Sequence, residues 1–286
     1  MSGLDRVVLR SADGASAEVH LHGAHVTSWR PAPIGDERLF LSARSAFHGS
    51  AAIRGGIPVI FPQFAAEGPL PKHGFARTSE WALAEESKEP DGSARASFTL
   101  SPSPRTQAIW PASFLATLTV RVHGSTLRVE LDVRNTGAET VTFTAALHTY
   151  LRVYDVRQTE LVGLRGTRYR ESAAPGVFTL DDDDVLRIVG EVDRVYVDAP
   201  RRLVMREPDR ELAIEAAGFR DVVVWNPGSA RAAELKDMEP QGELRMLCVE
   251  AAAVQEPIRL HADGRWSGSQ TLIELPHEEN RATRMQ

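Results

Sequence analysis

The sequence contains very little cysteine, no long apolar run and no excess of positive charge. Cys248 is the only cysteine among 286 residues, which excludes an internal disulfide and a zinc cluster built from thiolates. No run of eighteen apolar residues occurs, and the N-terminal stretch MSGLDRVVLR lacks the apolar core of a signal peptide. We therefore expect a cytoplasmic protein that does not enter a membrane. The net charge of −6 and the pI near 5.9 argue against nucleic acid as a partner, because phosphate backbones require basic surfaces.

Alternation of apolar and polar residues with a period of two dominates the chain. Such segments, rich in Val, Thr, Leu and Phe, occupy residues 16–29, 95–100, 114–153, 202–207, 211–216, 221–227 and 244–254. Turns that contain Gly, Pro, Asn or Asp separate them. The one helical candidate of any length, residues 229–238, is short. We therefore predict an all-β fold, a single domain over residues 1–286 that forms a large antiparallel β-sandwich with few short helices and a frayed tail at about 277–286.

Three histidines lie close together in HLHGAH, namely His20, His22 and His25. In a strand the first two share a face, and an H-x-H pair can bind zinc or copper. However, Gly23 follows at once, and no cysteine or carboxylate at ligand spacing completes a site. We therefore expect surface histidines on an edge hairpin, and no metal.

His148 lies in a different setting, VTFTAALHTYL at 141–151. Alternation places Phe143, Ala145 and Leu147 on one face, which has the character of a core, and His148 on the opposite face of small and polar residues. An imidazole there titrates near neutrality and could transfer a proton. A lone histidine in a strand is more often structural, so the pattern alone leaves both interpretations open.

Glu250 ends the segment ELRMLCVE and shares an apolar face with Met246 and Cys248. A carboxylate on such a face is costly without a partner, and desolvation would raise its pKa to a value that suits a general base. The alternative is a glutamate that reaches solvent where the strand ends.

Residues 53–78, IRGGIPVIFPQFAAEGPLPKHGFART, combine an apolar character with two glycines in tandem, four prolines and a cluster of cations. The prolines interrupt ladder pairing, and the glycines permit close backbone approach, so we expect an ordered, irregular loop. Arg54, Lys72 and Arg77 on this loop could bind phosphate or carboxylate oxygens, or could pair with acidic residues of the fold. No P-loop spacing is present, so an anion site here favours a small phosphorylated ligand rather than a nucleotide.

Together, several motifs give the chain a family resemblance. In order they are IRGGIPVIFPQF, LPKHGFAR, ALHTYLRV, VDRVY, VVVWNP and CVEAAAV, and they extend over nearly the whole chain. The sequence thereby resembles the glucose-6-phosphate 1-epimerases, or hexose-6-phosphate mutarotases, of the galactose mutarotase-like superfamily. The resemblance implies a supersandwich of β-sheets and the interconversion of α and β anomers of an aldohexose 6-phosphate. It also implies that neither a metal nor an organic cofactor takes part.

The resemblance assigns roles residue by residue. His148 matches the family's general acid, and Glu250 matches its general base. The substrate-binding positions fall on Arg54, Lys72, His73, Arg77 and Asp193, with the two arginines as sugar-phosphate ligands. The sequence departs from the usual pattern at Ala65-Ala66, where a glycine is frequent, and in a short connection to LPKHG.

Three alternatives share this sequence pattern. A carbohydrate-binding or sugar-phosphate-sensing protein without catalysis could use the same fold, although it would not need both His148 and Glu250. A mutarotase for unphosphorylated hexoses would need the acid and base but not the cations. A glycoside hydrolase would need two carboxylates that flank the scissile bond. We expect a small-molecule hexose phosphate as the ligand and a monomeric protein.

Overall fold

The computed structural model describes residues 5–47, 51–174 and 176–276, and these residues form three antiparallel sheets. The predicted tail at 277–286 lies outside the described residues. The nine-stranded sheet has the order β14 (Val185–Arg187), β11 (Glu160–Val162), β16 (Arg202–Glu207), β17 (Arg210–Ala217), β20 (Arg265–Leu275), β8 (Thr126–Asn135), β7 (Phe114–His123), β6 (Ala94–Leu100) and β5 (Ala82–Lys88).

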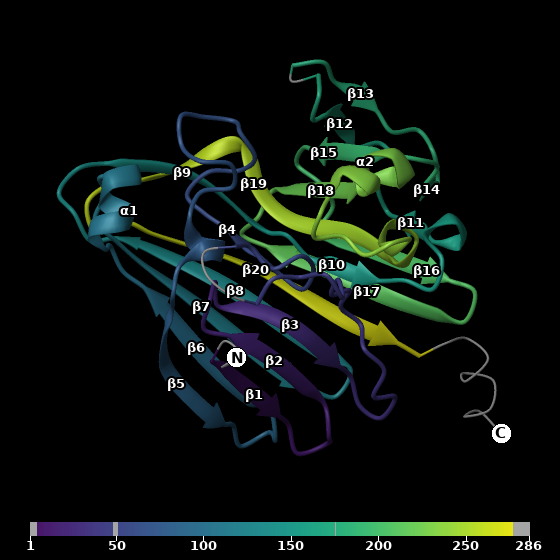
Figure 1. Cartoon of the computed structure of the whole chain (residues 1–286), viewed down its shortest axis with the longest axis horizontal. Helices are drawn as coiled ribbons and strands as arrows, with labels where there is room; N and C mark the ends of the chain where they lie inside the picture. The colour runs from purple at the N-terminus through teal and green to yellow at the C-terminus, as the bar shows by residue number, and fades with distance from the viewer. Residues whose placement is uncertain (1–4, 48–50, 175, 277–286) are drawn as a thin grey trace.

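The eight-stranded sheet has the order β13 (Thr179–Leu180), β12 (Arg168–Glu171), β15 (Val192–Tyr196), β18 (Asp221–Asn226), β19 (Met246–Leu260), β9 (Val141–Leu147) and β4 (Val59–Ile60), and β10 (Tyr150–Arg152) also pairs with β19. The third sheet contains β1 (Arg6–Arg10), β2 (Ser16–His20) and β3 (His25–Arg30). β1 and β2 pack against β6 and β7 of the nine-stranded sheet (Figure 1). The predicted all-β fold of large antiparallel sheets is confirmed.

Strand alternation explains why the nine-stranded sheet has one buried face. In β8, Leu127 and Leu131 are fully buried, whereas Arg128 and Arg134 are exposed. Apolar side chains from all three sheets meet on this face in one hydrophobic cluster, which includes Leu118 of β7. Burial of alternate apolar residues is the main force that fixes the register of such a sheet.

The eight-stranded sheet is buried on both faces. Val249 and Ala251 of β19 face the main core, whereas Cys248 and Ala252 belong to two smaller clusters on the outer face. Glu250 lies between Cys248 and Ala252 and therefore faces outward. Loops and α2 (Gly228–Glu234) cover this outer face, and Figure 1 shows α2 beside β18. A polar cavity can therefore form between the sheet and the segments that cover it.

The helical content is small, as the sequence predicts, but its placement differs in two details. The helical candidate at 229–238 is shorter in the structure, where α2 ends at Glu234 and Leu235 is already extended. A second helix, α1 (Pro104–Ile109), was not predicted. It begins at Ser103, whose side chain accepts a hydrogen bond from the Thr106 backbone N–H, with proline at the first turn. The remaining helical turns are 3-10 segments at Ala76–Thr78, Val156–Gln158 and Gly242–Arg245. Neither α-helix in the described ranges has the length or the apolar character to cross a bilayer.

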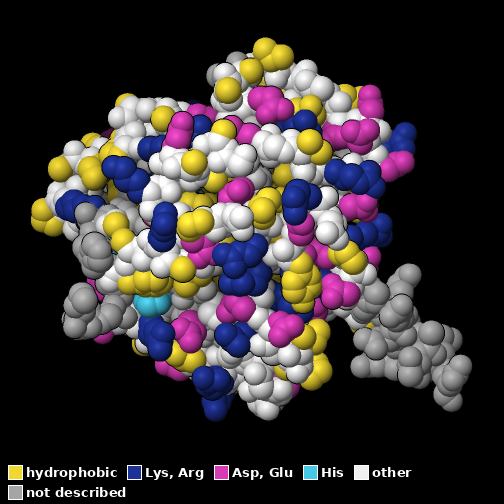
Figure 2. All heavy atoms as spheres, turned by 45° about the vertical axis from the view of Figure 1, so that its right-hand side comes forward, with side chains coloured by type: hydrophobic (Ala, Val, Ile, Leu, Met, Phe, Trp, Pro, Cys, Tyr) yellow, Lys and Arg dark blue, Asp and Glu magenta, His cyan; other side chains and the backbone are white. Residues whose placement is uncertain are grey.

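The surface carries charges of both signs. On the face shown in Figure 2, Lys and Arg side chains are interspersed with Asp and Glu side chains, and apolar side chains occur between them. Elsewhere in the described structure, charged side chains form ion pairs across neighbouring strands, for example Arg6 of β1 with Glu18 of β2 at 3.0 Å. Such exposed pairs contribute little to stability.

Candidate active site

All seven residues that the sequence singles out as a site line one cavity of about 250 Å³ on the outer face of the eight-stranded sheet. Glu250 comes from β19, His148 from the connection after β9, and Asp193 from β15. Arg54, Lys72, His73 and Arg77 come from the irregular loop. Other lining residues are Phe64, Ala65, Ser172, Val223, Trp225, Arg231 and Leu235.

His148 and Glu250 are in direct contact at the floor of this cavity. His148 Nδ1 lies 3.2 Å from Glu250 Oε1, and the side chains are 10% and 1% exposed. The second carboxylate oxygen, Glu250 Oε2, is buried without a hydrogen-bond partner among the described residues. Glu250 lies within β19, which continues to Leu260, so the alternative in which it reaches solvent at a strand end is wrong.

Burial dominates the pKa values of this pair. It raises the pKa of Glu250 well above the ordinary value, and the charge of Asp193 raises it further, while Arg77 opposes the shift. Burial also lowers the pKa of His148 well below its ordinary value, and His73, Arg77 and Arg54 act in the same direction. Both shifts favour the neutral forms, a protonated carboxyl group and a neutral imidazole.

Aromatic rings hold His148 in place. Its ring stacks on Tyr150 with a centroid distance of 4.8 Å and an interplanar angle of 8°. Trp225 and His73 contact it edge-on at 5.9 and 5.8 Å. Because His148 and Tyr150 point to the same side, the predicted alternation holds there, although β9 itself ends at Leu147.

The irregular loop is shaped by positions that only glycine fits easily. Gly55 has a φ of 113°, and a Cβ atom there would lie 2.3 Å from the carbonyl oxygen of Phe40. The Gln63 side chain braces the loop from within, since its amide donates to the Leu70 carbonyl and accepts from the Leu70 N–H, both at 2.9 Å. This bracing fixes the segment that ends at His73.

His73 is a neutral imidazole whose tautomer is set by the backbone. The Ala65 N–H donates to His73 Nδ1 at 3.3 Å, which leaves the proton on Nε2. Burial, followed by the charges of Arg77 and Lys72, lowers the pKa of His73 to about 2. His73 is therefore suited to donate a hydrogen bond rather than to carry a charge.

Arg54 is held by two partners that the sequence analysis did not identify. Its Nη1 donates to the Tyr150 hydroxyl at 2.9 Å, and its Nη2 lies 3.1 Å from Asp237 Oδ2. Burial lowers the pKa of Arg54, but Tyr150 and Asp237 outweigh burial and raise it. Arg54 thus pairs with an acidic residue of the fold, one of the two possibilities that the sequence left open. Nothing in the local sequence around Asp237 signals this contact.

Asp193 lies on the wall of the cavity in a fixed orientation. Its Oδ1 accepts a hydrogen bond from the Ser172 hydroxyl at 2.5 Å, and Ser172 also lines the cavity. The remaining carboxylate oxygen is available to accept hydrogen bonds from ligand hydroxyls.

The donor set fits a metal ion poorly. Within the described ranges, His148, Cys248 and Glu250 offer ligand atoms within 4.8 Å of one another, and all three are buried. Burial raises the pKa of the Cys248 thiol well above its ordinary value, which disfavours the thiolate that a metal ion requires as a ligand.

The histidines of HLHGAH are not on the surface, so that expectation is wrong. His20, His22 and His25 are all buried. Residues from later in the chain contact them: Phe47 at His20, Ala51 at His22 and Gly55 at His25. His25 Nε2 donates to the Gly55 carbonyl at 2.7 Å, and burial lowers the pKa of His25 to about 3. His22 Nε2 lies 2.9 Å from the Ala51 carbonyl oxygen. At least His22 and His25 therefore support the loop that carries Arg54.

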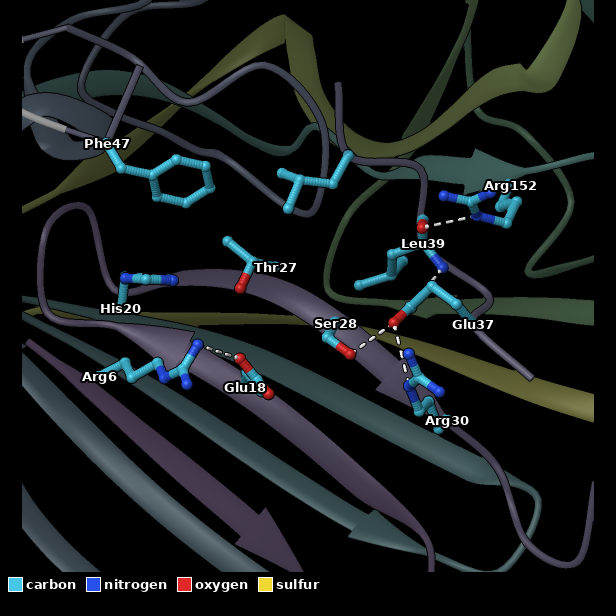
Figure 3. A pocket seen from close by; sticks show the side chains of 11 residues that line it. Arg6, Glu18, His20, Thr27, Ser28, Arg30, Glu37, Leu39, Phe47 and Arg152 are labelled. Carbon is cyan, nitrogen blue, oxygen red and sulfur yellow. Dashed lines mark hydrogen bonds and ion pairs between the residues drawn. The ribbon is translucent and has the colours of Figure 1, made fainter. Parts of the chain in front are cut away.

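A larger cavity of about 790 Å³ lies against the N-terminal sheet, but its charged groups are engaged with one another (Figure 3). Arg6 pairs with Glu18, and Arg30 lies 3.7 Å from Glu37. Arg152 contacts the Leu39 carbonyl oxygen at 3.5 Å. Because Arg6 and Arg30 are each paired with a glutamate here, whereas His148 and Glu250 lie together in the smaller cavity, the smaller cavity is the better candidate for chemistry.

The chain is similar in sequence to known proteins. The model that describes the aldose 1-epimerase family matches residues 5–272. A protein from Cenchrus ciliaris, named as a candidate glucose-6-phosphate 1-epimerase, is 35% identical over 284 residues, which cover 96% of this chain and 86% of the relative. A protein of the same name from Escherichia coli is 36% identical over 245 residues, with coverage of 84% and 80%.

Solved structures show the same fold. The crystal structure of a candidate mutarotase from Salmonella typhimurium superposes with a TM-score of 0.88 at 29% identity, covering 97% of this chain and 92% of that one. A galactose mutarotase related enzyme from Lactobacillus acidophilus gives a TM-score of 0.74 at 13% identity, with coverage of 96% and 98%. At that low identity the second likeness shows the fold alone.

Proposed function

This chain belongs to the aldose 1-epimerase family, and we propose that it interconverts the α and β anomers of an aldohexose 6-phosphate, with glucose 6-phosphate as its substrate. The protein is accordingly an isomerase that acts on a small sugar molecule. The choice of a phosphorylated hexose rests on the cations in the cavity and on the names of the relatives. The cytoplasmic localisation and the monomeric state stay predictions from the sequence.

The contact between His148 and Glu250 carries the proposal. Mutarotation opens a hemiacetal: a base removes the proton of the C1 hydroxyl while an acid protonates the ring oxygen. These two oxygens are bonded to the same carbon, so the acid and the base must lie close together. A separation of 3.2 Å at the floor of a cavity meets that requirement.

One proton on the pair is enough for the whole cycle. The reaction begins with Glu250 as the carboxylate and His148 as the imidazolium, whose opposite charges attract each other across the 3.2 Å contact. Glu250 then takes the C1 hydroxyl proton and His148 donates its proton to the ring oxygen as the ring bond breaks. Rotation about the C1–C2 bond presents the other face of the aldehyde, and the reverse transfers close the other anomer. Each group is expected to contribute about 10²–10⁴-fold to the rate.

The other predicted residues bind and orient the sugar. Asp193 accepts hydrogen bonds from sugar hydroxyls, and His73 donates from Nε2. Arg54, Lys72 and Arg77 supply positive charge along the cavity. Held in this way, C1 meets the reacting pair in one orientation, which lowers the entropic part of the barrier.

Exchange spectroscopy tests the proposal directly. The rate of exchange between the anomeric proton signals of glucose 6-phosphate should rise in proportion to the concentration of protein. Galactose 6-phosphate and free glucose, measured in parallel, report the sugar and phosphate preference. Saturable binding of glucose 6-phosphate without accelerated exchange would instead indicate a sensing protein, and faster exchange of free glucose would indicate a mutarotase for unphosphorylated hexoses.

A further inference from the structure

The four cations that line the cavity divide into an inner and an outer pair. The inner pair, Arg54 and Arg77, is half-buried, and both charges lower the pKa of His148. Arg54 is also compensated by Asp237 and fixed by Tyr150. The inner cations therefore lie on the side of the reacting pair, where the sugar ring must sit.

The outer pair consists of Lys72 and Arg231, which come from different segments of the chain. Lys72 belongs to the irregular loop and Arg231 to α2, and both are exposed at the cavity. The nearest carboxylate to Arg231 is that of Glu191, at 3.8 Å, and the side chains are 46% and 47% exposed, so this pair contributes little. No ion pair to Lys72 occurs among the described residues. The outer cations are thus largely uncompensated.

Lys72 and Arg231 repel each other. After burial, the charge of Arg231 is the largest influence that lowers the pKa of Lys72. Two like charges that converge on one cavity are destabilising unless an anion binds between them. A phosphate group offers oxygens to the planar guanidinium fork and to the ammonium group at the same time.

The 6-phosphate lies outside the sugar ring. C6 is attached to C5, beside the ring oxygen, and the C5–C6 and C6–O6 bonds carry the phosphate beyond the space that the ring itself occupies at Glu250 and His148. We propose that Arg231 and Lys72 bind the 6-phosphate at the mouth of the cavity, and that Arg231 is the residue that selects a phosphorylated over a free sugar. This inference rests on the proposed function for the orientation of the sugar. The resemblance to known epimerases does not assign Arg231, and it gives the phosphate to Arg54 and Arg77 instead.

Arg231→Ala tests the assignment, with Lys236→Ala as the matched control. Lys236 lies shortly after α2, is exposed and does not line the cavity, so the control removes the same charge from the same segment. Arg231→Ala should raise the KM for glucose 6-phosphate about 10- to 100-fold with kcat unchanged, and should leave exchange of free glucose unchanged. Arg231→Lys should recover part of the loss, and Lys236→Ala should behave as wild type.

Binding of inorganic phosphate separates this inference from the proposed function. Wild type should bind phosphate in a calorimetric titration, and Arg231→Ala should weaken that binding by a factor similar to the rise in KM. An equal loss for glucose 6-phosphate and free glucose, or unchanged phosphate binding in Arg231→Ala, would overturn the assignment. If wild type does not accelerate anomer exchange at all, the proposed function fails. The phosphate titrations of wild type, Arg231→Ala and Lys236→Ala would still decide whether Arg231 binds phosphate.

Discussion

His148 Nδ1 lies 3.2 Å from Glu250 Oε1, although one residue follows β9 and the other lies in the middle of β19. The antiparallel register brings them together, since Leu147 of β9 pairs with Ala251 of β19. The sheet therefore holds both side chains on its outer face without any movement of a loop. Such rigid support is what an acid–base pair needs for repeated proton transfer.

The two residues should act as one unit in mutant kinetics. Glu250→Gln and His148→Asn should each lower kcat by about 10²–10⁴-fold, because each removes one partner in proton transfer. The double variant should be no slower than the slower single variant, since neither residue can catalyse ring opening without the other. Circular dichroism should show unchanged strand content in all three. Losses that multiply in the double variant would show that the residues act independently.

Arg54→Ala should affect phosphorylated and free sugars alike. Its guanidinium is held by Tyr150 and Asp237 on the side of the reacting pair, so its loss should lower kcat/KM for glucose 6-phosphate and for glucose by the same factor, about tenfold or more. Arg220→Ala, which removes an exposed guanidinium paired with Asp198 and Glu256, serves as the control. A loss confined to glucose 6-phosphate would identify Arg54 as the phosphate ligand and contradict the inner position argued above.

Gly55→Ala should destabilise the protein through a backbone clash. A Cβ atom would lie 2.3 Å from the Phe40 carbonyl oxygen at a φ of 113°, so the free energy of unfolding should fall by about 3 kcal/mol or more. Gly14→Ala is the matched control, because φ there is 96° and nothing lies within 4 Å of the added atom. Only backbone strain acts in the control, which should lose about 1–2 kcal/mol in urea unfolding. Equal losses would show that the contact with Phe40 has no energetic role.

His25 should make stability dependent on pH. Its folded pKa of about 3 lies below the ordinary value of 6.5, so between these values the unfolded chain binds a proton that the folded chain does not. The free energy of unfolding should therefore fall as pH decreases through this window, by up to about 1.4 kcal/mol per pH unit from this one group.

His25→Gln tests this dependence, since Gln offers an N–H donor to the Gly55 carbonyl but does not titrate. Urea unfolding of wild type and variant between pH 4 and 6.5 should give a shallower slope for the variant by about one proton. An identical slope in wild type and His25→Gln would show that His25 takes up its proton in the folded protein.

Local alternation was sufficient to predict the faces of the strands. Phe143 and Leu147 lie in the main core and His148 points to the other side, as the period of two indicates. The buried histidines were missed, because their burial depends on a covering segment that contains Gly55 and comes from later in the chain. Local sequence cannot reveal which surface a distant segment will cover.

Local sequence likewise predicted some residues of the candidate site and not others. The motifs predicted His148, Glu250 and the cations of the irregular loop. Such residues can be recognised from local sequence, because a polar residue on an apolar strand and cations in a segment rich in Gly and Pro are unusual. Arg231 and Asp237 were missed, since their relevance comes from the placement of α2 and the segment after it beside that loop. The alternative in which Glu250 reaches solvent was wrong, since β19 continues to Leu260 and loops and α2 cover the face that carries Glu250.

The most direct measurement is the rate of α–β exchange of glucose 6-phosphate by NMR, with wild type and Glu250→Gln at equal concentrations. The proposed function predicts that wild type accelerates exchange above the spontaneous rate and that Glu250→Gln, which retains the fold and still binds the sugar phosphate, returns the rate to near the spontaneous value. Acceleration by Glu250→Gln equal to that by wild type, or none by wild type, would contradict it.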